Sequence, residues 1–389
     1  MSLINLAQSA VGVLGYSVLP FVVILVILVV VHELGHFVTA KMAGVQVLEF
    51  GLGYPPKLAG FRFGRRPAPS TAGADTDERT EYTINALPLG GFVRLLGEED
   101  PGDPRSLAAK PRGIRILVLA AGALMNLLLP VVLFTASFMI PQQVPVGRVV
   151  IQQVAANSPA QQAGIQSGDQ IVSINGEKVQ NLGDVANAIR LEQGRTMTWQ
   201  IRRGRDLISK QVYARWAPPV QVDAQTGRKS QQGPTGIELS TPDAFTQTQS
   251  YPIWEAVPKA VRTVFDVLVL TRNQMLSALL ARTAPQLVGP VGIAQVTGEV
   301  AKQAGGLGLL QIAAQISISL AIVNILPLPM LDGGRIMFVI LEIIRRGKRV
   351  APEKEALVHL VGFVLLIGLV VVISYFDVTR IIHGGSVFR

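Results

Sequence analysis

Long uncharged runs alternate with segments of ordinary polarity along the chain. Residues 1–31, 116–147 and 303–331 contain no Asp, Glu, Lys, Arg or His, and residues 356–376 contain only His359. About 20 helical residues cross the ~30 Å hydrocarbon core of a bilayer. The pattern therefore predicts four transmembrane helices, at about 18–42, 115–140, 307–331 and 357–376.

The loops between these helices indicate their orientation. A short basic loop, Arg345-Arg346-Gly347-Lys348-Arg349, separates the last two helices, and short basic loops stay on the cytoplasmic side. This places both termini and residues 141–306 outside, and residues 43–113 inside. A cleaved signal peptide is the alternative for the first run. It is disfavoured because a positive n-region and a small-residue cleavage site are missing, and because the apolar run continues into His32 and Glu33.

Composition narrows the class of protein. Of 389 residues, 49% are hydrophobic and 16% charged, against roughly 25% charged in an ordinary globular chain. This excludes a disordered protein and disfavours a purely soluble enzyme. The chain has no cysteine, which excludes a thiol nucleophile and cysteine-ligated zinc. The membrane topology explains the net charge of +9, because basic residues gather in loops on the cytoplasmic side. The sequence shows no pattern of basic and aromatic residues that would indicate nucleic acid as a partner.

The outer segment contains one region of soluble character. Ser158-Pro159 is typical of a helix start and Asn175-Gly176 of a hairpin turn. Alternation over residues 197–201 indicates one strand, and a turn at 203–205 leads to another around 208–213. Residues 217–250 are predicted to be a linker with one strand at 236–239. Residues 252–283 are predicted to form an amphipathic helix near the outer membrane surface.

A candidate metal site lies at the end of the first apolar run, where residues 32–36 read His-Glu-Leu-Gly-His. Residues four apart share one face of a helix, so His32 and His36 can hold one metal ion, with Glu33 beside them as general base. Ionisable side chains inside a membrane helix are costly and usually functional. The alternative is that both imidazoles only form hydrogen bonds between helices.

A catalytic zinc needs a third protein ligand. Asp332 is the first charge after the uncharged run 303–331, and the predicted topology brings it to the same membrane depth as the two histidines. Pro327 and Pro329 interrupt the helix before it, which is tolerated at membrane depth where the backbone lines a cavity. The alternative role for Asp332 is a cap on a helix over 333–344.

Together these residues resemble the site-2 protease family of intramembrane zinc metalloproteases, in its bacterial RseP-type branch. The resemblance rests on the segments 32–36 and 324–333, and on Gly122 and Asn126, which match the Gly-x-x-x-Asn motif of the family. Residues 289–293 match a further family segment. Two departures are Ala123, where the family often has proline, and a single PDZ-like region where many relatives have two.

The resemblance implies roles for individual residues. His32, His36 and Asp332 would bind one zinc ion per chain, and Glu33 would activate the attacking water. Asn126 and Asn324 would help to hold the substrate near the metal. Residues 149–179 resemble part of a circularly permuted bacterial PDZ domain, which would bind a peptide or gate substrate access; the alternative is a small α+β domain without a peptide ligand.

The inner segment carries two candidate strands, at 47–53 and 82–95, separated by a predicted loop at 65–79. They match a family region that forms a membrane-associated β-hairpin. Gly90 and Gly91 lie in the second strand and would contact the substrate, since an exposed strand edge can pair with an unwound peptide. The alternative is that the strands only cover the metal site.

The expected fold is thus a polytopic α-helical membrane protein with four transmembrane helices, an inserted α+β PDZ domain and a membrane-associated β-hairpin region. The expected segments are a first helix with the zinc motif (1–43), a cytoplasmic loop (44–113), a second helix (114–140), the PDZ domain and linker (141–240), an amphipathic region (241–306), a third helix with the Asp motif (307–344), a basic loop (345–356), and a fourth helix with an outer tail (357–389).

The expected function is intramembrane zinc-dependent cleavage of membrane-spanning segments, in the bacterial cytoplasmic (inner) membrane. The resemblance implies single-span substrates such as anti-sigma factors or signal-peptide remnants, within the lipid bilayer. A zinc-binding scaffold that recruits partners without cleavage is the alternative, and Glu33 disfavours it because a scaffold needs no general base. A metal transporter is disfavoured because we find no inverted repeat of hydrophobic segments.

Overall fold

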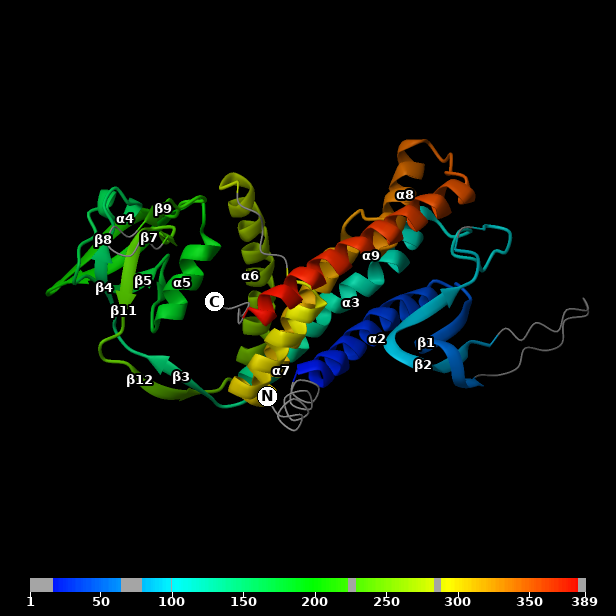
Figure 1. Cartoon of the computed structure of the whole chain (residues 1–389), viewed down its shortest axis with the longest axis horizontal. Coiled ribbons are helices and arrows are strands. Elements are labelled where there is room, and N and C mark those ends of the chain that lie inside the picture. Colours follow the sequence, from blue (N-terminus) through cyan, green and yellow to red (C-terminus); the bar gives the residue numbers. More distant parts are fainter. Residues whose placement is uncertain (1–16, 64–78, 99, 223–228, 283–287, 384–389) are drawn as a thin grey trace, which may run out of the picture. The chain divides into compact units, whose positions relative to one another are not determined.

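The structure is a computed structural model that describes residues 17–63, 79–98, 100–222, 229–282 and 288–383 (Figure 1). The chain divides into two compact units. Residues 138–286 form one, here called the inserted domain. The chain before and after it forms the other, here called the helical unit.

The helical unit contains four helices that are long and apolar enough to cross a membrane. This finding confirms the four predicted apolar helices. They are α2 (Leu19–Met42), α3 (Arg112–Met139), α7 (Pro290–Ile325) and α9 (Pro352–Ile382); a shorter helix, α8 (Asp332–Ile344), lies between the last two.

The bounds of α7 and α9 differ from the prediction. The third apolar helix ends at Ile325, not at Leu331, because Leu326 takes the extended conformation favoured before a proline. Upstream, α7 includes a helical segment from Pro290, which the prediction places in the outer amphipathic region. Gly305 (φ 58°, ψ −145°) breaks the helix between the two parts. The fourth helix already begins at Pro352, since proline is well suited to the first helical turn.

Small residues bring the helices of this unit close together. A Cβ atom on Gly35 of α2 would overlap the carbonyl oxygen of Ala121 on α3. The Ser317 hydroxyl of α7 donates a hydrogen bond of 2.8 Å to the backbone oxygen of Asn126 on α3. Such close approach is typical of helices packed in a membrane. It places α2, α3 and α7 around a common centre.

Two bent strands, β1 (Val47–Arg62) and β2 (Glu81–Leu95), pack beside α2 (Figure 1). Residues 49–52 of β1 lie between two segments of β2, and they pair with 91–94 on one side and with 81–84 on the other. Residues 81–84 pair in turn with 59–62 at the end of β1. The predicted strands are therefore present and longer than expected. The predicted loop between them falls largely on residues 64–78, outside the described residues.

The inserted domain is built on an antiparallel sheet in the order β11-β4-β5-β7-β8, with β6 paired to β5. Its core includes Trp199, Ile151 and Val185, all fully buried. The elements are β4 (Val149–Val154), α4 (Pro159–Gln162), β5 (Gln170–Ile174), β6 (Glu177–Lys178), α5 (Leu182–Leu191), β7 (Thr196–Arg203), β8 (Asp206–Tyr213) and β11 (Ile237–Ser240).

Local signals in this domain are confirmed. Ser158 accepts a hydrogen bond from the backbone N–H of Gln161 and caps α4. Asn175 and Gly176 both have positive φ, as the predicted hairpin turn requires. The predicted amphipathic helix is α6 (Ile253–Leu280), which contacts α5.

The prediction of a linker over 217–250 is wrong in part. This stretch contributes β9 (Val220–Val222), β10 (Lys229–Gln231) and β12 (Phe245–Gln249). The last strand pairs with β3 (Gln142–Val146), so it joins the two ends of the domain. The sequence shows no signal for β12, because the two-stranded ribbon that it forms with β3 is largely exposed and needs no apolar face.

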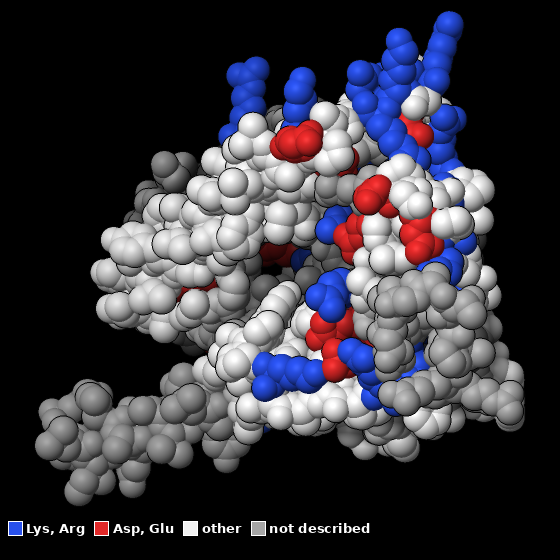
Figure 2. Space-filling model, turned by 90° about the vertical axis from the view of Figure 1, so that its right-hand side faces the viewer, with Lys and Arg blue, Asp and Glu red and all other residues white. Residues whose placement is uncertain are grey.

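Basic side chains gather at one end of the helical unit. Figure 2 shows them at the top of the view, the end where Figure 1 places the connection between α8 and α9. Arg345, Arg346 and Lys348 are exposed in this connection. The basic loop predicted from the sequence is therefore a surface of the folded unit.

Candidate metal centre

Three predicted ligands converge in the helical unit. His32 and His36 lie on one face of α2, and Asp332 is the first residue of α8. The Asp332 Oδ2 atom lies 3.1 Å from His32 Nε2 and 3.3 Å from His36 Nε2, and the two Nε2 atoms are 3.2 Å apart. The three atoms therefore form a nearly equilateral triangle, and they are the group among the described residues that could hold a metal ion.

The protonation of His36 follows from its second nitrogen. Its Nδ1 atom lies 2.8 Å from the backbone oxygen of Val118, and a carbonyl oxygen can only accept a hydrogen bond. Nδ1 of neutral His36 therefore carries the proton, and Nε2 presents a lone pair to the triangle. A backbone carbonyl that accepts from the second imidazole nitrogen is typical of metal-bound histidine.

The arrangement fits a tetrahedral metal ion. Bonds of about 2.0–2.1 Å to nitrogen and oxygen ligands separate the ligand atoms of a tetrahedral site by roughly 3.3 Å. The three separations in this site are close to that value. A cation placed among the two imidazole nitrogens and the carboxylate would interact favourably with all three. Three protein ligands also leave a fourth position for water or substrate, as catalytic zinc sites require.

Glycines make room for the centre. A Cβ atom on Gly122 of α3 would overlap the Nε2 atom of His36 and lie 2.6 Å from that of His32. On α8, Cβ atoms on Gly333 and Gly334 would overlap backbone oxygens of Leu326 and Leu328. The Gly residues after Asp332 therefore allow the start of α8 to pack directly on the end of α7, which brings the carboxylate to the histidines.

Glu33 lies beside the metal centre and against the β1–β2 sheet. Its side chain is half-buried, and the backbone amide of Val93 faces its carboxylate. A Cβ atom on Gly91 would lie 3.6 Å from Glu33 Cγ, and Gly90 has a φ of 101°, which favours glycine. Glu33, Gly90 and Gly91 are thus neighbours, as the predicted roles require.

Two amides flank His32 on the side away from the ligand triangle. The Nδ2 atom of Asn126 lies 3.3 Å from His32 Nδ1, and that of Asn324 lies 3.5 Å from the same atom. Asn126 is 1% exposed, whereas Asn324 is partly exposed. The structure therefore brings both predicted residues to the centre, with only Asn324 open to solvent.

Sequence reasoning assigned no role to Val118 or His359. Val118 acts through its backbone oxygen, which any residue type supplies, so no sequence signal identified it. His359 interrupts an apolar run and is buried at the start of α9. That interruption of an apolar run is a signal in the sequence that could have identified it.

Two histidines and an aspartate that could hold a metal ion lie beside a glutamate, on helices long and apolar enough to span a membrane. This is the arrangement expected of a membrane metallopeptidase. The comparisons with known proteins agree. The model of peptidase family M50 matches residues 20–369. The chain belongs to this family, the site-2 proteases, and is a metalloprotease.

Individual relatives cover nearly the whole chain. A protein of Clostridium perfringens is 35% identical over 352 residues, which are 90% of this chain and 95% of the relative. The zinc metalloprotease RasP of Geobacillus kaustophilus is 29% identical, with 94% of this chain and 98% of the relative covered. The regulator of sigma-W protease RasP of Bacillus subtilis is also 29% identical, over 94% of this chain and 99% of the relative.

Proposed function

We propose that this metalloprotease is a zinc endopeptidase that cleaves membrane-spanning segments of other proteins within the bilayer. The observation that carries the proposal is the convergence of His32, His36 and Asp332 beside Glu33, on helices long and apolar enough to span a membrane. Relatives named zinc metalloproteases support zinc as the metal.

In this proposal each residue has one task. His32, His36 and Asp332 hold the zinc ion, which when bound polarises the scissile carbonyl and activates the attacking water. Glu33 accepts the proton of that water and returns it to the departing amine. The Val93 amide beside Glu33 helps to orient the carboxylate. Asn126 is buried against His32, so we assign it to the orientation of this imidazole; Asn324, partly exposed, remains the candidate for substrate contact.

The β1–β2 sheet supports a mode of substrate binding. Residues 91–95 of β2 pair with β1 on one side, and no strand within the described ranges pairs with their other side. That segment lies beside Glu33, so an unwound substrate paired along it would present its backbone to the metal centre. Side chains at Gly90 and Gly91 would narrow this approach.

We further propose that the inserted domain is a PDZ domain that restricts substrate entry. Its element order supports this assignment, as does a sheet flanked by two short helices. The domain contains neither histidine nor cysteine, so it carries no alternative metal chemistry. Removal of residues 149–213 is expected to leave hydrolysis intact and to widen acceptance of substrates with bulky outer domains. If the deletion variant is inserted in the membrane and loaded with zinc but cleaves nothing, the proposal that this domain only restricts substrate entry is wrong.

The proposed setting is the bacterial cytoplasmic membrane, with both termini and the inserted domain outside. The basic connection between α8 and α9 supports this orientation. The relative named regulator of sigma-W protease supports single-span anti-sigma factors as substrates. Signal-peptide remnants are the other proposed substrates, since they too are single apolar helices.

The test is Glu33→Gln in the full chain. Glutamine keeps the size of the side chain but cannot accept the proton. Cleavage of a single-span substrate should therefore fall by roughly 10²–10⁴-fold while zinc content is unchanged. Glu353→Gln is the matched control, because Glu353 is exposed at the start of α9.

Zinc content, crosslinking to substrate and cleavage are measured on the same preparation. Uncut substrate should accumulate on the Glu33→Gln variant, since the binding contacts are intact. Wild-type turnover in that variant would overturn the proposed mechanism. A zinc-loaded wild type that cleaves no membrane-spanning substrate would favour a scaffold that only recruits partners.

A further inference from the structure

The loop between α7 and α8 sets the position of the Asp332 carboxylate. Residues 326–331 connect Ile325, the last residue of α7, to Asp332. Within this loop Met330 has a φ of 71°, in the left-handed region. This region is unfavourable for a residue with a Cβ atom. Inside the loop, the turn bond of 3.3 Å from the Leu331 N–H to the Leu328 oxygen helps to hold the conformation, and a contact from outside the loop adds to it.

That contact comes from His359 on α9. The backbone N–H of Met330 donates a hydrogen bond of 2.8 Å to His359 Nδ1. An N–H group can only donate, so Nδ1 is the unprotonated nitrogen and the ring proton is on Nε2. His359 Nε2 faces Glu355, at 3.9 Å from Oε1, which is consistent with this tautomer.

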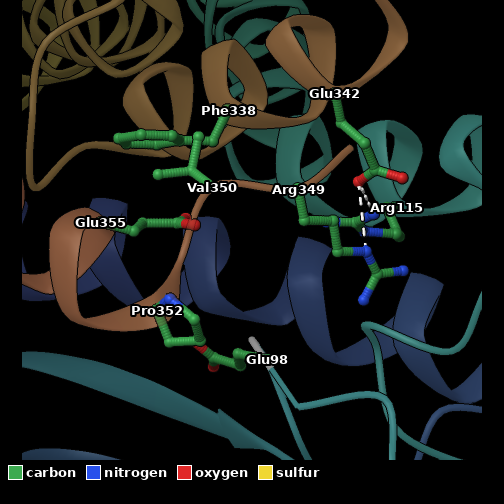
Figure 3. A pocket seen from close by; sticks show the side chains of 8 residues that line it. All are labelled: Glu98, Arg115, Phe338, Glu342, Arg349, Val350, Pro352 and Glu355. Carbon is green, nitrogen blue, oxygen red and sulfur yellow. Dashed lines mark hydrogen bonds and ion pairs between the residues drawn. The ribbon is translucent and has the colours of Figure 1, made fainter. Parts of the chain in front are cut away.

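The imidazole of His359 is itself held in place. It is 9% exposed, and its ring centroid lies 5.5 Å from that of Phe338 on α8. Figure 3 shows Phe338 and Glu355 together in the pocket between α8 and α9. One turn of α9 further on, a Cβ atom on Gly362 would overlap the ring of Pro329, so the loop packs directly on this helix.

The far end of α8 is anchored in the same pocket. Glu342 accepts hydrogen bonds from Arg115 at 2.6 Å and from Arg112 at 3.2 Å. Its carboxylate lies 3.4 Å from Arg349 Nε, and Figure 3 shows Arg115 and Arg349 beside it. These contacts hold the last turn of α8 against α3. The position of its first turn depends on the preceding loop. The contact between Met330 and His359 is a polar link from α9 to the loop before that first turn.

We propose that His359 is a positioning residue for the metal centre: by accepting the Met330 N–H, it holds the loop that aims Asp332 at His32 and His36. The inference rests on the ligand set proposed above. It extends that set to a residue that contacts neither the metal ligands nor the substrate.

The test compares two substitutions of similar size, His359→Asn and His359→Leu, in the full chain purified in detergent. The Oδ1 atom of asparagine occupies nearly the position of Nδ1 in histidine, so it can accept the Met330 N–H, whereas leucine cannot. Transfer of zinc to a competing chelator and the visible spectrum of the Co²⁺-substituted protein report on the centre without activity.

We expect the His359→Leu variant to retain metal roughly 10–100-fold less tightly, as is typical when an outer partner of a metal site is lost. Its Co²⁺ spectrum should shift, and the His359→Asn variant should resemble the wild type in both measurements. Equal behaviour of the two variants, whether both intact or both impaired, would overturn the proposal.

Two further variants separate the possible failures. Asp332→Ala tests the ligand set itself: if it keeps wild-type zinc retention, the proposed ligands are wrong. If Asp332→Ala loses zinc and His359→Leu does not, only the role of His359 is wrong. Met330→Gly should reduce the effect of His359→Leu, because glycine adopts the left-handed conformation without the cost that the hydrogen bond offsets.

If the His359 variants do not fold, substitutions elsewhere on α9 test the same role of this helix. Gly362→Ala would push on Pro329, whereas Gly368→Ala on the same helix has open space around the new Cβ atom. Weaker metal retention in the first of these variants alone supports positioning of the loop by α9. Equal retention in both would overturn it.

Discussion

Gly122 lies directly against His32: a Cβ atom on this glycine of α3 would lie 2.6 Å from Nε2 of the imidazole on α2. The same Cβ atom would overlap Nε2 of His36. The space above both metal-facing nitrogens therefore exists only because residue 122 has no side chain. The glycine of the Gly-x-x-x-Asn motif therefore forms part of the wall of the candidate metal centre.

Gly122→Ala is expected to displace both imidazoles and to lower metal affinity and cleavage together, by roughly 10–100-fold. Gly113→Ala is the control on the same helix, since a Cβ atom there meets no atom within 4 Å. Zinc content and turnover are measured for both variants. A zinc-replete Gly122→Ala variant with normal turnover would show that the centre has more room than the structure indicates.

Asn126 is expected to act on His32 as a hydrogen-bond acceptor. The described residues give its Oδ1 atom no hydrogen bond, and a half-turn of the amide places that oxygen on His32 Nδ1. His32 Nε2 is then free to bind metal. Asn126→Asp keeps an acceptor and should retain zinc, whereas Asn126→Leu should retain it about tenfold less tightly. Competition with a chelator distinguishes them, and equal retention in both variants would refute this role.

Asp377 of α9 is expected to stabilise the helical unit by capping α7. It is 1% exposed, and its Oδ2 atom accepts a hydrogen bond of 2.9 Å from the backbone N–H of Gly292. A carboxylate at a helix N-terminus also interacts favourably with the helix dipole. Asp377→Ala should cost about 1–3 kcal/mol of unfolding free energy, since it leaves this N–H unpaired. Asp377→Asn keeps an acceptor and should cost less.

Thermal unfolding of the purified protein, followed by circular dichroism, compares the two Asp377 variants with the wild type. The wild type should be the most stable, followed by Asp377→Asn and then by Asp377→Ala. If the Asp377→Ala variant unfolds at the wild-type temperature, the cap makes no net contribution.

The inserted domain is expected to lose stability in acid through Asp169. Burial alone would raise the pKa of this carboxyl, but the hydrogen bonds from Arg203, at 2.7 and 2.8 Å, and from the Gln166 N–H hold its pKa below the ordinary value. A folded-state pKa below the unfolded one means that the stabilisation is present above the unfolded pKa, about 3.9, and is lost as the pH falls through the folded pKa.

Urea unfolding followed through tryptophan fluorescence measures this effect in the full chain, because all three tryptophans, Trp199, Trp216 and Trp254, lie in the inserted domain. Asp169→Asn should destabilise the domain by about 1–3 kcal/mol at neutral pH, and it should reduce the further loss of stability as the pH falls below the unfolded pKa of about 3.9. If the stability of the Asp169→Asn variant falls in acid as much as that of the wild type, other groups cause the loss.

Features that depend on near neighbours in the chain were predictable from the sequence. The spacing of His32 and His36 places both on one face of a helix whatever surrounds it. Uncharged runs long enough to cross a bilayer predict helices, since backbone groups in hydrocarbon must be paired internally. The Asn175-Gly176 turn and the Ser158 cap follow from the conformations that these residues adopt.

Only the tertiary structure decided which distant groups complete the centre. The partner of His36 is a backbone oxygen 82 positions away, which leaves no trace in residue type. The partner of Met330 is a histidine 29 positions away, and Gly122 lies against both imidazoles because α2 and α3 approach closely, as they also do at Gly35. A local pattern specifies its own backbone conformation, but the partner of a hydrogen bond or a van der Waals contact is chosen by packing of the whole unit, and no periodicity in the chain encodes that choice.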